Sequence, residues 1–181
     1  QAEVRVLADD GTGLMVRSAD ESTAKNDLSV NIKDLNLGEL ANVLPYLPKL
    51  QGHLNGDFHL VDDGQTLSAM GSLEAKDFAY EQAALGTLGA EIAYLPNSQG
   101  EHHVDAFVTH NGAEVAEVAG NYLTPGNGRF EGTARLIDFP LPLLNGFLGE
   151  SGVAMRGTAQ GTLEVNGALS APRLNGDLHL N

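Results

Sequence analysis

Along most of this chain, apolar and polar residues alternate with a period of two. Leu28, Val30 and Ile32 alternate with Ser, Asn and Lys, and the same pattern recurs over residues 57–60 and 177–180. Successive side chains of a β-strand point to opposite faces, so this pattern predicts strands with one apolar and one polar face. We therefore expect a protein that is mainly β.

Pairs of Asn or Asp with Gly punctuate these runs. They occur at Asp63-Gly64, Asn111-Gly112 and Asn166-Gly167, and related turn sequences stand at residues 9–11 and 125–128. Such pairs tolerate the positive φ that tight turns need, so they predict antiparallel hairpins. By contrast, Asn55-Gly56 and Asn175-Gly176 interrupt an alternating run from within. There we expect a bulge, or a bend that lets the sheet curl.

Two stretches depart from the strand pattern and predict short helices. Leucine recurs with helical spacing near residues 37–44, where Asn36 can cap the start and Pro45 can end the helix. The second stretch, near 142–148, has its large apolar residues on one side and prolines at its start. Each helix has about two turns, too few to be stable alone, so we expect both to lie on the sheet.

The chain also contains an internal repeat. LNGDFHL at residues 54–60 recurs as LNGDLHL at residues 174–180. A shift of 105 positions places Gly52, Gly56 and Gly71 on Gly157, Gly161 and Gly176, and a shift of 104 places Asp34 and Leu37 on Asp138 and Leu141. We expect a first β-repeat unit over 1–106, with the helix near 37–44, and a second, truncated unit over 107–181, with the helix near 142–148.

Repeated strand units stack so that each unit covers the open edge of its neighbour. Together with the alternation, the repeat predicts an elongated, curled antiparallel sheet with two short helices. Chance similarity between Gly- and Leu-rich segments is the alternative explanation of the repeat.

Composition narrows the classes of function. The 24 acidic residues outnumber the 10 Lys and Arg and give a net charge of −14, which disfavours binding to nucleic acid and to anionic membrane surfaces. The absence of cysteine fits an oxidising compartment such as the periplasm. The longest apolar stretch, at 139–149, is too short and too rich in proline to span a bilayer. Because the chain begins at Gln1 and not at Met, we expect a membrane anchor outside it.

The histidines and acidic residues do not form a recognisable reactive site. His102 and His103 are adjacent and so point to opposite faces of a strand, while His59 and His179 fall at polar positions. The acidic pairs that precede a glycine fit turns better than a calcium loop. No serine-hydrolase, zinc-protease or phosphate-loop motif is present. We expect no metal, no cofactor and no enzymatic activity.

The order of these features resembles the AsmA/TamB-like family of bacterial envelope proteins, and most of all the TamB-type proteins of the Bacteroidetes. GTLEVNGALSAPRLNGDLHL at 161–180 matches the family's recurring spacing of glycine, leucine and a proline-leucine step. GDFHLVDDGQTLSAMGSLEAKDF at 56–78 keeps the glycines but has Ala69 where that step would fall. LIDFPLPLLNGFL at 136–148 is similar to the family's strand followed by a short helix. The resemblance covers most of the chain, and its weight lies in the order of motifs that are individually degenerate.

The resemblance implies a long sheet folded into a trough that is apolar inside and polar outside. Proteins of this family are anchored in the inner membrane, cross the periplasm and carry phospholipid towards the outer membrane. TamB-type members also support outer-membrane biogenesis with an outer-membrane barrel protein. For this chain the resemblance implies a non-enzymatic periplasmic segment whose partners are phospholipid acyl chains and, through the longer protein, such a barrel.

On this hypothesis the lining of the groove is distributed over the apolar strand positions. The candidates are Leu28, Val30, Ile32, Phe58, Leu60, Leu73, Leu163, Val165, Leu178 and Leu180. The same residues would also suit a closed core sealed by the two short helices, and both interpretations stay open. The alternative function is a cell-surface β-repeat module that binds glycan or acts as a structural spacer. A glycan site would need exposed aromatic residues along a polar groove, and most of the 6 Phe and 4 Tyr fall at apolar positions.

Overall fold

The structure is a computed structural model. It describes residues 3–7, 12–18, 26–39, 50–80, 83–124, 128–147, 155–168 and 171–181. The strands are β1 Glu3–Leu7, β2 Gly13–Ser18, β3 Asn26–Asn36, β4 Leu50–Asp62, β5 Leu67–Tyr80, β6 Ala83–Pro96, β7 Glu101–His110, β8 Ala113–Leu123, β9 Arg129–Pro140, β10 Thr158–Ala168 and β11 Ala171–Leu180. Within the described residues they form a single 11-stranded sheet in chain order, with every neighbouring pair antiparallel. The prediction of a mainly β, antiparallel protein is confirmed.

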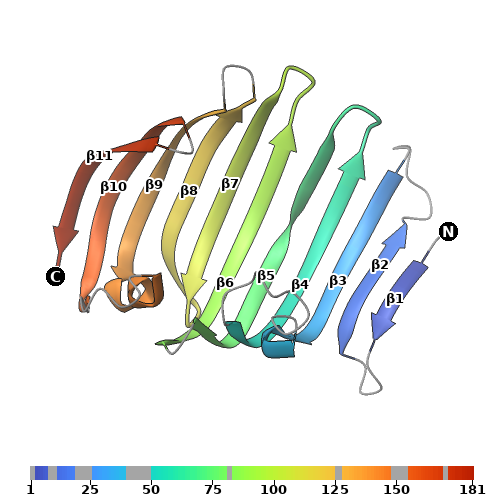
Figure 1. Ribbon diagram of the computed structural model, residues 1–181, viewed down its shortest axis with the longest axis horizontal. Helices are drawn as coiled ribbons and strands as arrows, with labels where there is room; N and C mark the ends of the chain where they lie inside the picture. The colour runs from blue at the N-terminus through green and yellow to red at the C-terminus, as the bar shows by residue number, and fades with distance from the viewer. Residues whose placement is uncertain are drawn as a thin grey trace.

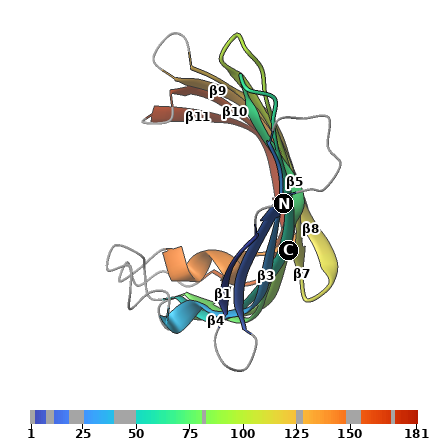
Figure 2. The same cartoon turned by 90° about the vertical axis from the view of Figure 1, so that its right-hand side faces the viewer.

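The sheet is open and strongly curled. Its two edges, β1 and β11, lie at opposite ends of the long axis of the molecule (Figure 1). Viewed along that axis, the strands bend into an open C (Figure 2). The hollow of the C therefore runs across the strands, from one edge of the sheet towards the other.

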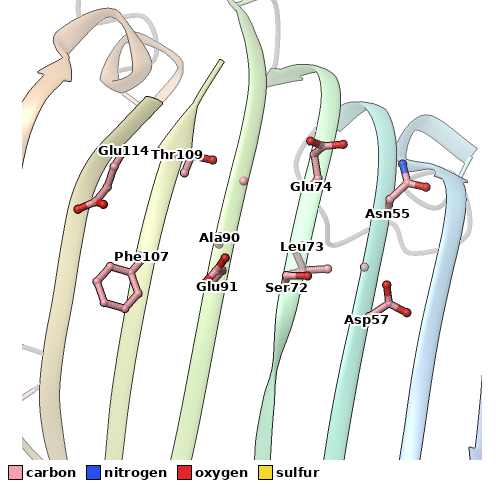
Figure 3. A pocket seen from close by; sticks show the side chains of 12 residues that line it. Asn55, Asp57, Ser72, Leu73, Glu74, Ala90, Glu91, Phe107, Thr109 and Glu114 are labelled. Carbon is pink, nitrogen blue, oxygen red and sulfur yellow. The ribbon is translucent and has the colours of Figure 1, made fainter. Parts of the chain in front are cut away.

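The two faces of the sheet differ in polarity. Leu28 lies opposite Leu60 and Val30 opposite Phe58, and residues paired in register share a face. Figure 3 views the sheet from its convex side, where Asp57 points outward. Because Phe58 follows Asp57 directly, its side chain and those in register with it lie on the concave face. The predicted division into one apolar and one polar face is confirmed.

Two of the predicted hairpin turns are present. Asn111 and Gly112 join β7 to β8 with φ of 51° and 82°, as a two-residue turn with two positive φ values requires. Between β4 and β5, the carboxylate of Asp63 accepts hydrogen bonds from the backbone N–H groups of Thr66 and Gln65, each at 2.8 Å. These two bonds lower the pKa of the Asp63 carboxyl group, and the bond from Thr66 has the larger effect.

The predicted turn at Asn166-Gly167 is wrong. Both residues lie inside β10, where they pair with Arg173 and Pro172 of β11. The β-strand continues because backbone pairing on both sides outweighs the local turn preference of the two residues. The turn predicted at 9–11 lies outside the described residues, and so do residues 125–127 of the turn predicted at 125–128.

The bulges lie elsewhere than predicted. Gly56 pairs with Ile32 and Leu73, and its pairing with β3 shifts register directly after the Ile32–Gly56 pair, where the extra residue belongs to β3. Gly176 pairs with Leu163 in continuous register. Neither glycine is itself the bulged residue, and the alternative of a bend at these glycines stays a prediction. The register shifts instead at Asp34, Asp77 and Asp138, whose φ values are 50°, 50° and 48°. Asp tolerates this left-handed conformation better than most residues, which explains why it stands at each of these bulges.

Equivalent positions of the internal repeat adopt similar local structure. At the bulge of β3, the backbone N–H of Asp34 donates to Oδ1 of Asn55. At the bulge of β9, the side chain of Gln160 donates to the side chain of Asp138. Gln160 is 105 positions after Asn55, and Asp138 is 104 positions after Asp34. The boundary expected between residues 106 and 107 falls within β7, inside the continuous sheet. The division into two units stays a prediction from the repeated sequence.

The prediction of two short helices is wrong as it was made. The second stretch is a 3₁₀ helix, η1, over Leu141–Phe147. Pro142 lacks an N–H donor and Gly146 is a poor helix former, so a regular α-helix is disfavoured there. At the first stretch, Oδ1 of Asn36 accepts the N–H of Gly38 at 2.9 Å, and residues 37–39 are helical. The rest of that stretch lies outside the described residues, which contain no complete α-helix.

Buried apolar residues gather at one margin of the sheet. Those in the described part of the chain are Leu37, Leu85, Val115, Ala116, Leu143 and Ala159. They lie at the end of the strands where η1 rests on the concave side, and η1 contacts β6 there (Figures 1 and 2). The side chain of Asn145 fixes η1 by bonding both the carbonyl and the N–H of Met155, at 3.0 and 2.7 Å.

No helix among the described residues has the length and hydropathy needed to cross a membrane.

Candidate functional site

All ten residues predicted to line a groove lie on the concave face. They form one group on β3, β4 and β5 and another on β10 and β11. In the first group Gly56 stands between Ile32 and Leu73 in register. In the second, Leu163 lies opposite Gly176. Eight of the ten side chains are half-buried, and the two on β11 are exposed.

The strands between these groups complete the apolar face, although the sequence prediction did not assign them to the groove. One register row runs through Val16, Val30, Phe58, Gly71, Ile92, Ala106, Val118, Ala134, Leu163 and Gly176. The next runs through Leu14, Ile32, Gly56, Leu73, Ala90, Val108, Ala116, Leu136, Gly161 and Leu178. Both rows cross every strand from β2 to β11 without a polar residue.

Glycine on this face makes room for a large side chain on the neighbouring strand. A Cβ on Gly71 would lie 2.7 Å from Cδ1 of Phe58, and one on Gly56 would lie 2.6 Å from Cδ2 of Leu73. Phe130 lies in the same way beside Gly120, where a Cβ would come within 2.5 Å of Cζ. Side chains on the inside of a bent sheet converge, so the glycines allow the curvature while keeping the face apolar.

The margin of the concave face opposite η1 is amphipathic. His102 stacks on Tyr94 with ring centroids 5.9 Å apart and packs against Tyr122 at 5.8 Å. Its Nδ1 bonds the Tyr94 hydroxyl at 2.7 Å, and its Nε2 bonds Oγ1 of Thr124 at 2.8 Å. The rings therefore extend the apolar face while their polar atoms are satisfied at its rim.

The convex face carries polar ladders and a shallow hollow. In Figure 3 the hollow extends from β4 to β8, with Asp57 at one side, the ring of Phe107 towards the other and Glu91 between them; the carboxylates of Glu74 and Glu114 also line it. Phe107 is 46% exposed, which matches its place among the polar positions of β7. The glycan-binding alternative would place its ligand here. The hollow is lined by these carboxylates together with the hydroxyl groups of Ser72 and Thr109.

The histidine pair points to opposite faces, as predicted. His102 lies on the concave face, whereas His103 bonds Oδ1 of Asn121 at 2.8 Å and Oδ2 of Asp105 at 2.9 Å on the convex face. The hydrogen bond to Asn121, and then that to Asp105, raise the pKa of His103. In the described part of the chain, no three His, Cys, Asp or Glu side chains are grouped so that they could hold a metal ion.

Comparisons of the chain with family models, curated proteins and solved structures gave no match. The candidate site is therefore defined by its geometry and residue chemistry.

Proposed function

We propose that this chain is a non-enzymatic segment of a bacterial envelope protein, and that its concave face holds the acyl chains of phospholipids in transit between the inner and outer membranes. The observation that supports this function best is the pair of apolar rows from β2 to β11. Neighbouring strands are about 4.8 Å apart, so each row extends for about 40 Å, more than the roughly 30 Å thickness of a bilayer's hydrocarbon core.

The energetics of such a groove favour loose binding along its length. Burying an acyl chain yields about 0.8 kcal/mol per CH₂, so a dozen methylenes give at most about 10 kcal/mol. The lining is aliphatic over most of its length and offers few directional contacts. A tail held in this way can slide from one strand to the next, because each step exchanges one set of apolar contacts for a similar set.

The charge distribution supports the same function. The net charge of −14 disfavours direct adsorption of the polar face onto an anionic bilayer, so lipid would enter by way of the apolar face. The periplasmic location, the inner-membrane anchor outside this chain and the outer-membrane barrel partner belong to the same proposal. They rest on the sequence resemblance to AsmA/TamB-like proteins.

Two neighbouring residues on β10 provide a matched test. Leu163 points into the groove, whereas Thr162 is exposed on the other face. The purified chain should bind a diacyl phospholipid, detected by native mass spectrometry and by extraction. Leu163→Asp should reduce that binding at least tenfold, since a charge in the lining forfeits about 1.5–3 kcal/mol of apolar contact. Thr162→Asp should leave it unchanged.

Circular dichroism of each variant separates loss of binding from loss of the fold. If Leu163→Asp unfolds the chain, Ile92→Asp tests the same row on β6, with Glu91→Gln on the opposite face as its control. Failure of the unaltered chain to take up lipid, or equal binding by both variants of a folded pair, would reject the proposed groove.

A further inference from the structure

Two large apolar side chains are exposed on the convex, polar face of the sheet. Met70 on β5 is 50% exposed, and Phe107 on β7 is 46% exposed. Both line one hollow of about 430 Å³, together with Ala93 of β6, which lies opposite Met70 in register. Single apolar side chains are common on protein surfaces, whereas large ones that share a hollow among polar residues are typical of a binding surface.

This hollow is part of a longer depression that crosses the strands. Phe107 also lines a hollow of about 530 Å³ over β4 to β8, and one of about 330 Å³ over β7 to β10. The small residues Gly89 and Ala119 line these two hollows beside the ring. The 430 and 530 Å³ hollows together form the convex groove. Because neighbouring strands are about 4.8 Å apart, this groove is about 19 Å long from β4 to β8.

The convex groove has an acidic lining. It contains carboxylates and no Lys or Arg, and the carboxylates belong to Asp57, Glu74, Glu91, Asp105 and Glu114. Glu74 pairs with Lys76 at 3.3 Å. In the part of the chain that the structure describes, Glu91 and Glu114 have neither a hydrogen-bond nor an ion-pair partner. Glu91 lies opposite Phe107 in register, so uncompensated negative charge lies beside the exposed ring (Figure 3).

A Lys or Arg side chain of a partner matches the ring and the charge at once. Its aliphatic stem can cover Phe107 while its cationic head reaches the carboxylate of Glu91. The face of an aromatic ring also attracts a cation within about 6 Å of its centre. An apolar side chain of the same partner can then cover Met70. Apolar anchors surrounded by a charged rim are the usual anatomy of a protein interface.

Charge disfavours the other occupants that an apolar surface could have. A second copy of the chain carries the same net charge of −14, and nucleic acid and anionic membranes are also negative. We infer that the convex groove is the docking site of a basic protein segment that presents an apolar side chain between Lys or Arg residues. A helix of about 13 residues would span the groove from β4 to β8. This inference does not depend on what the concave face holds.

Two designed peptides test whether the chain binds such a segment. The first is a helix-forming peptide of Leu and Lys, about 14 residues long, with its leucines in a single stripe. The second has Glu in place of every Lys. Fluorescence anisotropy should show that the Leu/Lys peptide binds the unaltered chain and that its affinity falls as the salt concentration rises. The Leu/Glu peptide should not bind.

Matched pairs of variants locate the bound peptide. Phe107→Thr should weaken binding at least about tenfold, whereas Leu95→Thr, at an exposed position of the same face outside the groove lining, should leave it unchanged. Glu91→Gln should weaken binding about threefold. Glu164→Gln removes an exposed carboxylate of the same face on β10 and should have no such effect. Circular dichroism confirms that each variant is folded, and Met70→Thr replaces Phe107→Thr if the latter unfolds the chain.

Absence of binding by the Leu/Lys peptide would overturn the inference, as would equal binding by both variants of a folded pair. Loss of peptide binding on Ile92→Asp, with Phe107→Thr unaffected, would place the peptide on the concave face and overturn it as well. A chito-oligosaccharide serves as a third probe. If it binds with dependence on Phe107 while the Leu/Lys peptide does not bind, the convex groove is a glycan site and the inference is wrong.

Discussion

At the scale of single residues, the concave face is shaped by pairs of a glycine and a large side chain. Phe58 and Gly71 lie in register, and the ring occupies the space that a Cβ on Gly71 would need. The same Cβ would come 2.2 Å from the carbonyl oxygen of Asp57. A Cβ at position 71 would therefore clash with the backbone of β4 as well as with the ring of Phe58.

We expect Gly71→Ala to destabilise the chain by about 2–3 kcal/mol, because the neighbouring backbone cannot move aside. Gly89→Ala is the matched control. Its Cβ would meet mainly Oγ1 of Thr109, at 2.4 Å, and that side chain can rotate. Gly89→Ala should stay within about 1 kcal/mol of the unaltered chain, helped by the lower entropy of its unfolded state. Urea unfolding measures both values, and equal losses would contradict the proposed role of crowding.

Also at the scale of single residues, protonation of His103 should make the free energy of unfolding depend on pH. Its pKa is raised by hydrogen bonds to Asn121 and then Asp105, so the folded state binds its proton more tightly than the unfolded state. The resulting stabilisation is fully present below the ordinary pKa of 6.5 and is lost as pH rises through the raised value. The stability difference between the unaltered chain and His103→Gln should shrink over that interval.

Urea unfolding from pH 5.5 to 8.5 tests this dependence. The effect should be small, because the His103 side chain is 40% exposed and water screens the interaction. Asn121→Ala should remove most of the same pH dependence, since the bond to Asn121 is the larger cause. A difference between the unaltered chain and His103→Gln that does not vary with pH would argue against protonation of His103 as its source.

At the scale of elements, bulges and tight turns decide where each strand bends or ends. Asp34 and Asp138 have φ of 50° and 48° near the ends of β3 and β9, and each strand is followed by helical residues. A non-glycine residue in this conformation costs about 1–2 kcal/mol, and a β-branched residue costs more. The two bulges therefore set the point at which the chain leaves the sheet.

Asp34→Val should lower the free energy of unfolding by about 2 kcal/mol, because valine resists positive φ and cannot accept a hydrogen bond from His53, whose Nδ1 lies 3.0 Å from Oδ1 of Asp34. Asp34→Gly should remain within about 1 kcal/mol of the unaltered chain, since glycine relieves the backbone while losing an exposed contact. The same pair of changes at Asp138 should behave alike. Chemical denaturation of the four variants provides the comparison, and a Val variant as stable as its Gly counterpart would refute the account.

The predictions of strands and turns from the sequence were most accurate where a sequence pattern is compatible with only one local structure. Alternation at Leu28, Val30 and Ile32 predicts a strand face, and Asn111-Gly112 predicts a two-residue hairpin turn; both are present. Asn166-Gly167 has the same turn chemistry, yet pairing on both sides keeps it within β10. Local preference alone does not show which competing pairing is available.

The central lining of the groove was harder to predict for a similar reason. Ala90, Ala106 and Ala134 are small and give little alternation, so their strands lack a clear apolar signal. Their place on the concave face follows from register with Leu73, Ile92 and Leu163, which is a property of the sheet. A count of apolar parity across successive predicted hairpins would have been the signal able to find them.

At the scale of the whole molecule, the sheet behaves as a one-dimensional array. Each strand contacts chiefly the strands next to it in the chain, and η1 adds contacts to β6. There is no second sheet among the described residues to bury the concave face, so stability depends mostly on pairing between neighbours. Such arrays open from their ends, because an edge strand is held on one side only.

The rate of backbone amide hydrogen exchange should therefore increase from the central strands of the sheet towards both of its edges. Backbone amides of β5, β6 and β7 should exchange most slowly, and those of β1 and β11 most quickly, in exchange followed by mass spectrometry. Removing β11 by truncation after residue 168 should then make β10 the fast-exchanging edge and leave β5 to β7 almost unaffected. Uniform loss of protection across all strands would instead indicate a single cooperative core, which would exclude an array stabilised by neighbouring strands and would favour a closed interior over an open groove.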